Sequence, residues 1–89
     1  MLAIINFNKE CAAWTKNGAC NKAFVECNIN YVYEKLKHEG YVYLNDMYEI
    51  FGALWNPDEY NYCFKRGGQE PRFSYQCIND VDFKICIIW

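Results

Sequence analysis

Six cysteines and one histidine carry the most reactive side chains of the sequence, and their spacing limits the chemistry that they could perform. Zinc sites usually need paired ligands about two to four residues apart, but no Cys-x-x-Cys pair occurs and His38 is the only histidine. Disulfides are the alternative, yet most of the cysteines lie in apolar periodic segments, where a free thiol behaves as a small hydrophobic group. We therefore expect no metal, no cofactor and six reduced, mostly buried thiols: Cys11, Cys20, Cys27, Cys63, Cys77 and Cys86.

Catalytic chemistry has little support in the sequence. No serine or cysteine nucleophile has a general base at a recognisable spacing, and no glycine-rich loop follows a strand to open a helix. Gly67-Gly68 is typical of a hairpin turn, and His38 near a helix end suits the negative pole of the helix dipole. We expect no catalytic residues and no enzyme activity.

Negative charge is concentrated in the middle of the chain, although the net charge is only −2. Residues 39–59 hold five carboxylates and no Lys or Arg, whereas five Lys against three Glu precede this block and four basic against three acidic residues follow it. The block is either a solvated face that includes helix N-terminal charges or a surface that steers a basic partner. On the second interpretation the partner-binding residues are five carboxylates and two aromatic anchors: Glu39, Asp46, Glu49, Asp58, Glu59, Trp55 and Tyr60.

The stretch from Gly40 to Gly52 is expected to position much of this block, because it is typical of a strand that runs directly into a short helix. Residues 41–44 are β-branched and aromatic, which is strand composition. One apolar helical face then follows, given by the spacing of Met47, Ile50, Phe51 and Leu54.

The ends of this short helix carry typical capping residues. Asn45 suits an N-cap, and the alternative is a capping box of Asp46 with Glu49. Gly52 is placed to adopt the left-handed conformation that ends many helices.

The main helix is predicted over residues 21–38. Its apolar stripe contains Val25, Ile29, Val32 and Leu36, widened by Phe24, Cys27 and Tyr31. Asn28 and Asn30 are poor interior helix residues, so a break or a later start near Asn28 stays open. Gly40 is expected to end the helix.

Residues 1–18 allow two interpretations. In the first, residues 2–7 form a short strand, and Asn8 then caps a helix that carries Cys11, Ala12 and Trp14 and closes at Asn17-Gly18. In the second, a helix begins at the N-terminus.

Alternating residues predict three strands in the last third of the chain. Their same-side residues are, in order, Tyr60, Tyr62 and Phe64; Phe73, Tyr75 and Cys77; and Phe83, Ile85, Ile87 and Trp89. We therefore expect a single α+β domain over residues 1–89, with an N-terminal helical part, one strand leading into a short helix, and a C-terminal antiparallel β-meander packed on the main helix.

The location of the protein is predicted from what the N-terminus and the apolar runs lack. Met1 to Ile5 has no preceding basic region of the kind that signal peptides carry, and the apolar runs are too short to span a bilayer. We expect a protein of the bacterial host cytoplasm, with no membrane partner.

The motif Gly40-Tyr-Val-Tyr-Leu-Asn-Asp-Met-Tyr-Glu-Ile-Phe-Gly52 resembles a domain that recurs in small uncharacterised proteins of bacterial phages and mobile elements. The resemblance covers residues 39–64, with a weaker similarity at Val81-Asp82-Phe83, and Trp55 lacks the glycine that precedes it in the family pattern. It implies a strand-helix unit that leads into a small sheet, and it transfers no catalytic residues. Small acidic proteins of this kind are often inhibitors of host defence nucleases, including anti-CRISPR proteins.

The resemblance therefore implies a non-enzymatic inhibitor that binds a host nuclease or effector protein stoichiometrically through its acidic surface. A homodimer stays open. The alternative function is a single-stranded nucleic-acid-binding module that stacks bases on sheet aromatics beside Lys65, Arg66 and Arg72. An acidic chain with a pI near 5.3 lacks the surplus of positive charge on which such binding depends, so we do not expect a nucleic-acid partner.

Overall fold

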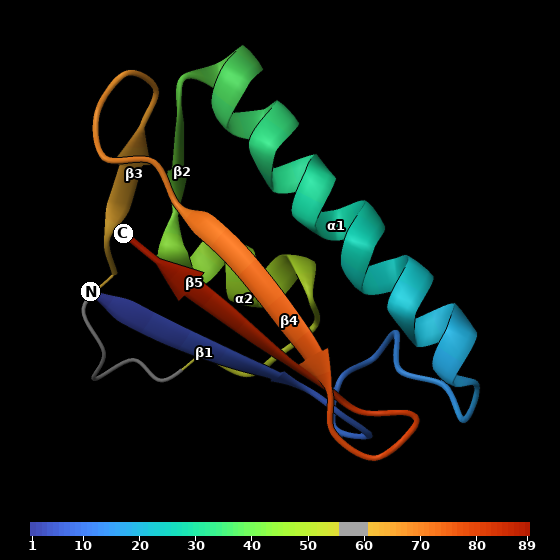
Figure 1. Cartoon of the computed structure of the whole chain (residues 1–89). Coiled ribbons are helices and arrows are strands. Elements are labelled where there is room, and N and C mark those ends of the chain that lie inside the picture. The colour runs from blue at the N-terminus through green and yellow to red at the C-terminus, as the bar shows by residue number, and fades with distance from the viewer. Residues whose placement is uncertain (56–60) are drawn as a thin grey trace.

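The computed structural model describes residues 1–55 and 61–89, which form five strands and two helices (Figure 1). The elements are, in order, β1 (Leu2–Phe7), α1 (Gly18–Glu39), β2 (Tyr41–Tyr43), α2 (Leu44–Ile50), β3 (Cys63–Lys65), β4 (Arg72–Cys77) and β5 (Phe83–Ile88). The predicted α+β class and the strand that leads into a short helix are confirmed. Neither helix in these described ranges has the length and apolar character needed to cross a membrane.

Two antiparallel sheets organise the strands. β5 lies at the centre of a three-stranded sheet in the order β1-β5-β4, while β2 and β3 form a separate two-stranded sheet. In the larger sheet Ile85 lies opposite Ile5 on one side and opposite Tyr75 on the other. The predicted antiparallel strands follow the short helix as expected, but the strand of Phe64 pairs with β2, and β1 completes the larger sheet.

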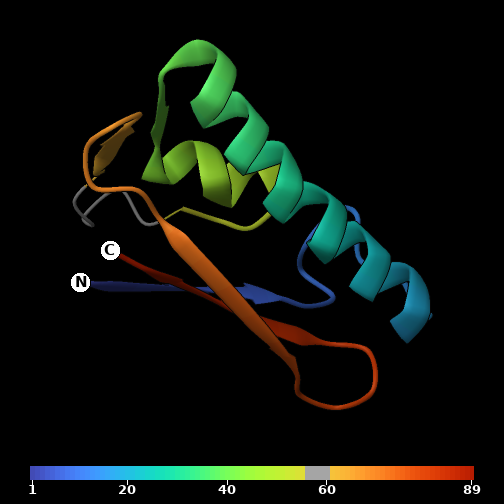
Figure 2. The same ribbon diagram turned by 45° about the horizontal axis from the view of Figure 1, so that its top comes forward.

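Both helices lie on the same side of the three-stranded sheet, and none of the other described elements covers its opposite side (Figure 2). The alternation of β1 and β5 turns their apolar side chains toward the helices. The residues of these two strands buried in the core are Ile5, Phe7, Phe83, Ile85 and Ile87.

The apolar stripe predicted for α1 supplies the other half of the core. Its four stripe residues are buried, and Phe24 beside them stacks on Phe7 with ring centroids 5.1 Å apart. Cys27 and Tyr31 are exposed, so their assignment to the stripe is wrong. Cys27 lies two residues after Val25, and Tyr31 lies two residues after Ile29. Two residues correspond to a rotation of roughly 200° around a helix, so both side chains point away from the buried stripe. The helix continues through Asn28, whose side-chain amide donates to the Phe24 carbonyl at 2.8 Å.

The segment before α1 forms turns rather than the predicted helix. β1 confirms the predicted strand, but Asn8 then closes a turn, accepting the Cys11 N–H on its carbonyl at 2.8 Å and the Glu10 N–H on its side chain at 3.0 Å. Such local bonds compete with helix formation. Asn17 does not close a helix: it caps the start of α1, accepting the Cys20 N–H at 3.1 Å.

One buried amide joins this segment to α1 and to the turn between β4 and β5. The Asn21 side-chain amide donates to the carbonyls of Thr15 (2.9 Å) and Val81 (2.8 Å). Its oxygen accepts from the Thr15 N–H (3.0 Å) and hydroxyl (3.1 Å). Beside it, a Cβ at Gly18 would lie 2.0 Å from the Asp80 carbonyl oxygen, so only glycine allows this approach. Asn21 therefore fixes three segments with a fully satisfied set of hydrogen bonds.

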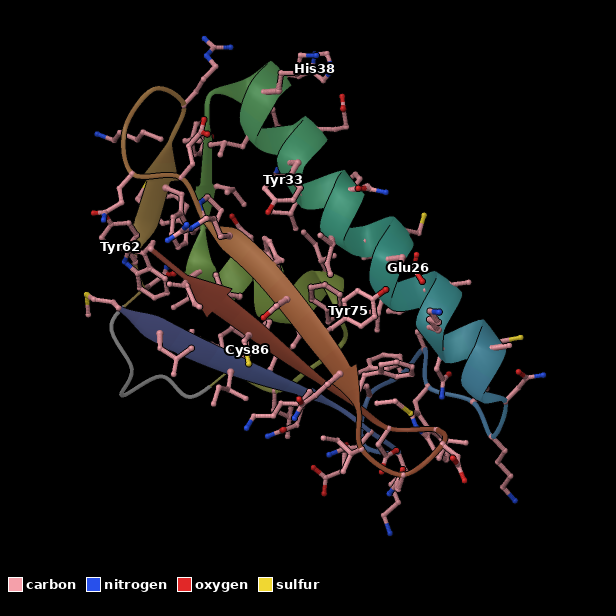
Figure 3. The ribbon with its side chains drawn as sticks, in the orientation of Figure 1. Glu26, Tyr33, His38, Tyr62, Tyr75 and Cys86 are labelled. Atoms are coloured by element: carbon pink, nitrogen blue, oxygen red, sulfur yellow. The ribbon has the colours of Figure 1, made fainter. Side chains whose placement is uncertain are left out.

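Two tyrosines hold α1 against β4. The Tyr33 hydroxyl accepts the Phe73 N–H at 3.2 Å, and the two rings lie edge to face at 5.5 Å. Tyr75 points from β4 toward Glu26 of α1 (Figure 3). The pKa of Tyr75 is raised, mainly by desolvation and to a smaller extent by a hydrogen bond to Glu26. The aromatic side of β4 is thus occupied by contacts with α1.

The short helix α2 begins and ends differently from the prediction. Leu44 is its first residue rather than the end of β2, and the Asp46 carboxylate accepts the N–H of the N-cap Tyr43 at 3.1 Å. Both predicted starts, at Asn45 and at an Asp46–Glu49 box, are therefore wrong. The left-handed conformation of Gly52 is confirmed, with φ at 71°. Because the helix ends before it, Leu54 is exposed instead of lying on the apolar face.

Candidate protein-binding surface

Two of the predicted carboxylates line one hollow between α1 and α2. Its volume is about 270 Å³, and its lining residues are Tyr31, Lys35, Asp46, Glu49 and Ile50. Asp46 and Glu49 reach the same hollow because residues three apart on a helix share a face. The hollow is therefore bounded by two carboxylates, one ammonium group, an aromatic ring and an aliphatic chain.

Lys35 connects this hollow to a third predicted carboxylate, that of Glu39. The two groups form an ion pair with 2.5 Å between the ammonium nitrogen and the carboxylate oxygen. The hydrogen bond to Glu39, more than any other neighbour, raises the pKa of Lys35, so the lysine stays charged. Three carboxylates against one ammonium group leave this part of the surface with a charge of −2.

Asp46 also has a structural role. Its carboxylate caps the strand-to-helix junction at Tyr43, and its side chain is only half exposed. A carboxylate in the first turn suits the positive end of the helix dipole. The helix-charge interpretation therefore accounts for Asp46, whereas Glu49 is an exposed carboxylate outside the cap.

Exposed tyrosines adjoin the carboxylates. The alternation of β2 buries Val42 and turns Tyr41 and Tyr43 outward, where their side chains are 51% and 40% exposed. Their rings lie edge to face with centroids 6.0 Å apart, and Tyr31 on α1 is 54% exposed. The neighbouring Cys63 raises the pKa of Tyr43, so this phenol stays neutral at physiological pH. We call the connected set the tyrosine–carboxylate surface: Tyr31, Glu39, Tyr41, Tyr43, Asp46 and Glu49.

Of the other predicted site residues, one packs against the core and three lie outside the described residues. Trp55 is half-buried and packs against the core, and its indole nitrogen is buried with no hydrogen-bond partner in the described ranges. Asp58, Glu59 and Tyr60 lie outside the described residues. His38 is in the last turn of α1, as predicted. Its Nε2 atom lies 3.0 Å from the Glu34 Oε2 atom on an exposed face of the helix.

Sequence reasoning missed the exposed tyrosines and Lys35. A signal existed for two of them, because a strand that buries Val42 must turn Tyr41 and Tyr43 to the opposite side. Tyr31 was missed because it was counted in the buried stripe of α1. The position of Lys35 at the hollow depends on how α2 folds back beside α1, which no local pattern encodes.

The cysteines remain six free thiols in the structure, but the expectation that most are buried is wrong. Only Cys11 is buried; Cys20, Cys27 and Cys77 are exposed, and the other two are half-buried. The error has two sources: Cys27 of α1 and Cys86 of β5 lie in periodic segments but on their outward sides, whereas Cys77 shares the helix side of β4 with Phe73 and is exposed at the end of that strand. Across residues 1–55 and 61–89, no three His, Cys, Asp or Glu side chains gather closely enough to hold a metal ion.

Alkylation should separate these thiols by rate. In native protein without reductant, we expect iodoacetamide to modify Cys20, Cys27 and Cys77 at least about tenfold faster than Cys11, because burial raises the pKa of the Cys11 thiol and hinders access to it. Peptide mass spectrometry over time measures each rate. In urea all six should react, and fewer than six adducts there would contradict the assignment of free thiols.

No family model matches the sequence, and no curated protein or solved structure matches the chain. The tyrosine–carboxylate surface must therefore be interpreted from its own chemistry. Exposed neutral aromatic rings beside carboxylates are suited to binding a surface that offers cations and apolar groups.

Proposed function

We propose that this protein is a non-enzymatic inhibitor of the anti-CRISPR type, which binds a host defence nuclease stoichiometrically in the bacterial cytoplasm. The observation that carries the proposal is the connected tyrosine–carboxylate surface on α1, β2 and α2. It combines three carboxylates with exposed rings of tyrosine, one of the residue types enriched among the anchors of protein interfaces. The resemblance of residues 39–64 to phage and mobile-element proteins supports the same class of function.

The mechanism is competition for a basic surface. Nucleic-acid-guided nucleases hold phosphate backbones in positively charged channels. Carboxylates that approach such a channel compete with phosphates for the same Lys and Arg side chains. Because the described surface holds only three carboxylates, charge alone cannot supply a tight complex. The tyrosines therefore supply most of the affinity, and the carboxylates increase the association rate and the selectivity.

The nucleic-acid alternative draws less support from the sheet. The rings of Phe73 and Phe83 point to the helix side, and Tyr33 covers Phe73. The open side of the three-stranded sheet carries aliphatic rather than aromatic side chains. Tyr41 and Tyr43 are exposed; Tyr41 lies opposite Lys65, whereas Tyr43 lies beside Asp46, whose carboxylate repels phosphate.

The partner can be captured with the intact chain. Tagged protein would be incubated with lysate from bacteria that carry nucleic-acid-guided defence systems, and bound proteins would be identified by mass spectrometry. We expect enrichment of one nuclease or effector, and inhibition of its cleavage when the two proteins are mixed at equal molar amounts. Failure of the purified protein to inhibit the captured enzyme would contradict the proposal.

Charge reversal tests how the surface acts. In the double variant Glu39→Lys with Glu49→Lys, we expect association with the captured nuclease to slow by about tenfold at low salt and to depend less on salt, because electrostatic steering is lost. Surface plasmon resonance at several salt concentrations gives both quantities.

The matched control is Glu34→Lys with Glu70→Lys, which makes the same change in net charge at exposed positions elsewhere. If both double variants associate at the wild-type rate with the wild-type salt dependence, the carboxylates form only a solvated face. If the wild-type protein binds single-stranded DNA at physiological salt, the stacking alternative replaces the proposal.

A further inference from the structure

The open side of the three-stranded sheet has a chemistry unlike that of the tyrosine–carboxylate surface. Strand alternation turns Leu2 and Ile4 of β1 and Cys86 and Ile88 of β5 away from the helices. Cys86 lies on β5, the central strand of this sheet (Figure 3). With Arg72 and Lys84, these four residues form what we call the aliphatic face.

The apolar residues of this face are contiguous and exposed. The register places Leu2 opposite Ile88 and Ile4 opposite Cys86. Neither pair exchanges backbone hydrogen bonds, because Met1 and Trp89, one position further, form a hydrogen-bonded pair, and such pairs alternate along a ladder. Side chains in these positions approach closely. Leu2, Ile4 and Ile88 are 60%, 37% and 43% exposed, which leaves a hydrophobic strip open to solvent.

Positive charge borders the strip. Arg72 lies opposite Ile88 on β4, and Lys84 is two residues before Cys86 on the same side of β5. The remaining outward positions of the three strands are uncharged, so the outward residues of β1, β4 and β5 supply two cations and no carboxylate. A complementary surface must therefore be apolar at its centre and acidic along its side.

The size of the face restricts the occupant. Three strands of six residues cover about 14 Å by about 20 Å, or roughly 300 Å². Stable globular interfaces bury about 800 Å² on each partner. A single α-helix is about 10 Å wide and needs about 13 residues to extend for 20 Å, so one helix of three to four turns fills the area.

We propose that the aliphatic face binds one amphipathic α-helix of a partner protein, which packs its apolar side on Leu2, Ile4 and Ile88 and directs acidic side chains toward Arg72 and Lys84. The helix would cover the open side of the sheet as α1 and α2 cover the other side. A second copy packed face to face suits this surface less well, because it would bring the cations of both copies together with no carboxylate between them. This interaction is separate from the tyrosine–carboxylate surface and does not depend on the function proposed for it.

The test uses two synthetic peptides with the full-length protein. The probe is an 18-residue fluorescein-labelled helix of Leu, Ala and Glu, with Leu at helical spacing and Glu on both flanks. The second peptide has Lys in place of every Glu. By fluorescence anisotropy at low salt, we expect the acidic peptide to bind at least tenfold more tightly than the basic one.

Two variants examine the apolar and charged parts separately. Ile4→Asp should weaken binding of the acidic peptide at least tenfold. Arg72→Glu with Lys84→Glu should reverse the preference between the two peptides, a result that general destabilisation cannot produce. Ala23→Asp on the solvent side of α1 is the matched control and should bind as the wild type does. Circular dichroism establishes that each variant is folded.

Several results would overturn the proposal. Equal binding of the two peptides, or unchanged binding by Ile4→Asp, would exclude the face as the site. Binding of the protein to phosphatidylglycerol vesicles, abolished by Ile4→Asp, would assign the face to a membrane surface. A dimer in sedimentation velocity that Ile4→Asp dissociates would assign it to a second copy of the chain.

Discussion

Replacing Asn21 with Asp should destabilise the protein by about 3 to 5 kcal/mol at neutral pH, the usual cost of an uncompensated buried charge. The side-chain nitrogen of Asn21 donates to the carbonyl oxygens of Thr15 and Val81. Aspartate puts a negative oxygen in that place, so three electron-rich oxygens meet in a buried site. The bonds that connect the start of α1 to its neighbouring turns would become repulsive.

The loss of stability in Asn21→Asp should increase as the pH rises. Burial and the two carbonyls raise the pKa of the introduced carboxyl above its unfolded value of about 3.9. Below that unfolded pKa the acid is neutral in both states and can donate one hydrogen bond, so most of the stability is retained. The free energy of unfolding should then fall as the pH rises and reach its full deficit above the raised folded pKa.

Urea denaturation of the variant and wild type from pH 3.5 to pH 7 measures this difference. Asn30→Asp, an exposed change in the same helix, is the matched control and should alter stability by no more than about 0.5 kcal/mol. An equal loss in both variants, or a deficit for Asn21→Asp that does not change with pH, would show that Asn21 does not hold the junction.

The double variant Tyr41→Ala with Tyr43→Ala should weaken binding to the captured nuclease by at least about 100-fold, chiefly through faster dissociation. Each aromatic anchor in an interface contributes about 2 kcal/mol or more, and two adjacent anchors need not be additive. These rings point outward from β2, while the buried side of the strand is formed by Val42. The loss should therefore appear in binding rather than in folding.

Surface plasmon resonance gives the rates for this variant, and urea denaturation gives its stability. Tyr75→Ala, which removes a partly exposed tyrosine of β4 that contacts α1, is the control for a general loss of stability: it should unfold at a lower urea concentration but bind as the wild type does. Tyr41→Phe with Tyr43→Phe keeps both rings and should retain most of the affinity. Wild-type affinity in the double alanine variant would exclude β2 from the interface.

Prediction from the sequence succeeded where a repeating pattern determined the structure. The buried stripe of α1 and the inward residues of β5 follow periods of 3.6 and 2, which residue types reveal directly. It failed at residues 8–17, where the side chain of Asn8 bonds to a neighbouring N–H in a turn. It failed again at the start of α2, because the N-cap is a tyrosine whose backbone, rather than its side chain, takes part in the cap.

The pairing of β3 with β2 was not predictable for a different reason. The Leu44 N–H donates to the Tyr62 carbonyl at 2.7 Å and the Arg66 N–H to the Gly40 carbonyl at 3.0 Å, between residues 18 and 26 positions apart. Local composition identifies a strand but not its partner. For the same reason, the sequence identified the carboxylate block, while the folded arrangement determined which carboxylates share a hollow and which tyrosines adjoin them.

The position of β5 has a consequence for the order in which the protein acquires its structure. β5 is the last element described, yet it is the strand that holds β1 and β4 together. During synthesis, β1 emerges first and has no strand partner until residues 83–88 have left the ribosome. Leu2 and Ile4 of β1 are therefore unpaired throughout that interval, together with the buried residues Ile5 and Phe7. The nascent chain therefore exposes β1 for longer than any other described strand, and a chaperone that binds β1 would protect it from aggregation during this interval.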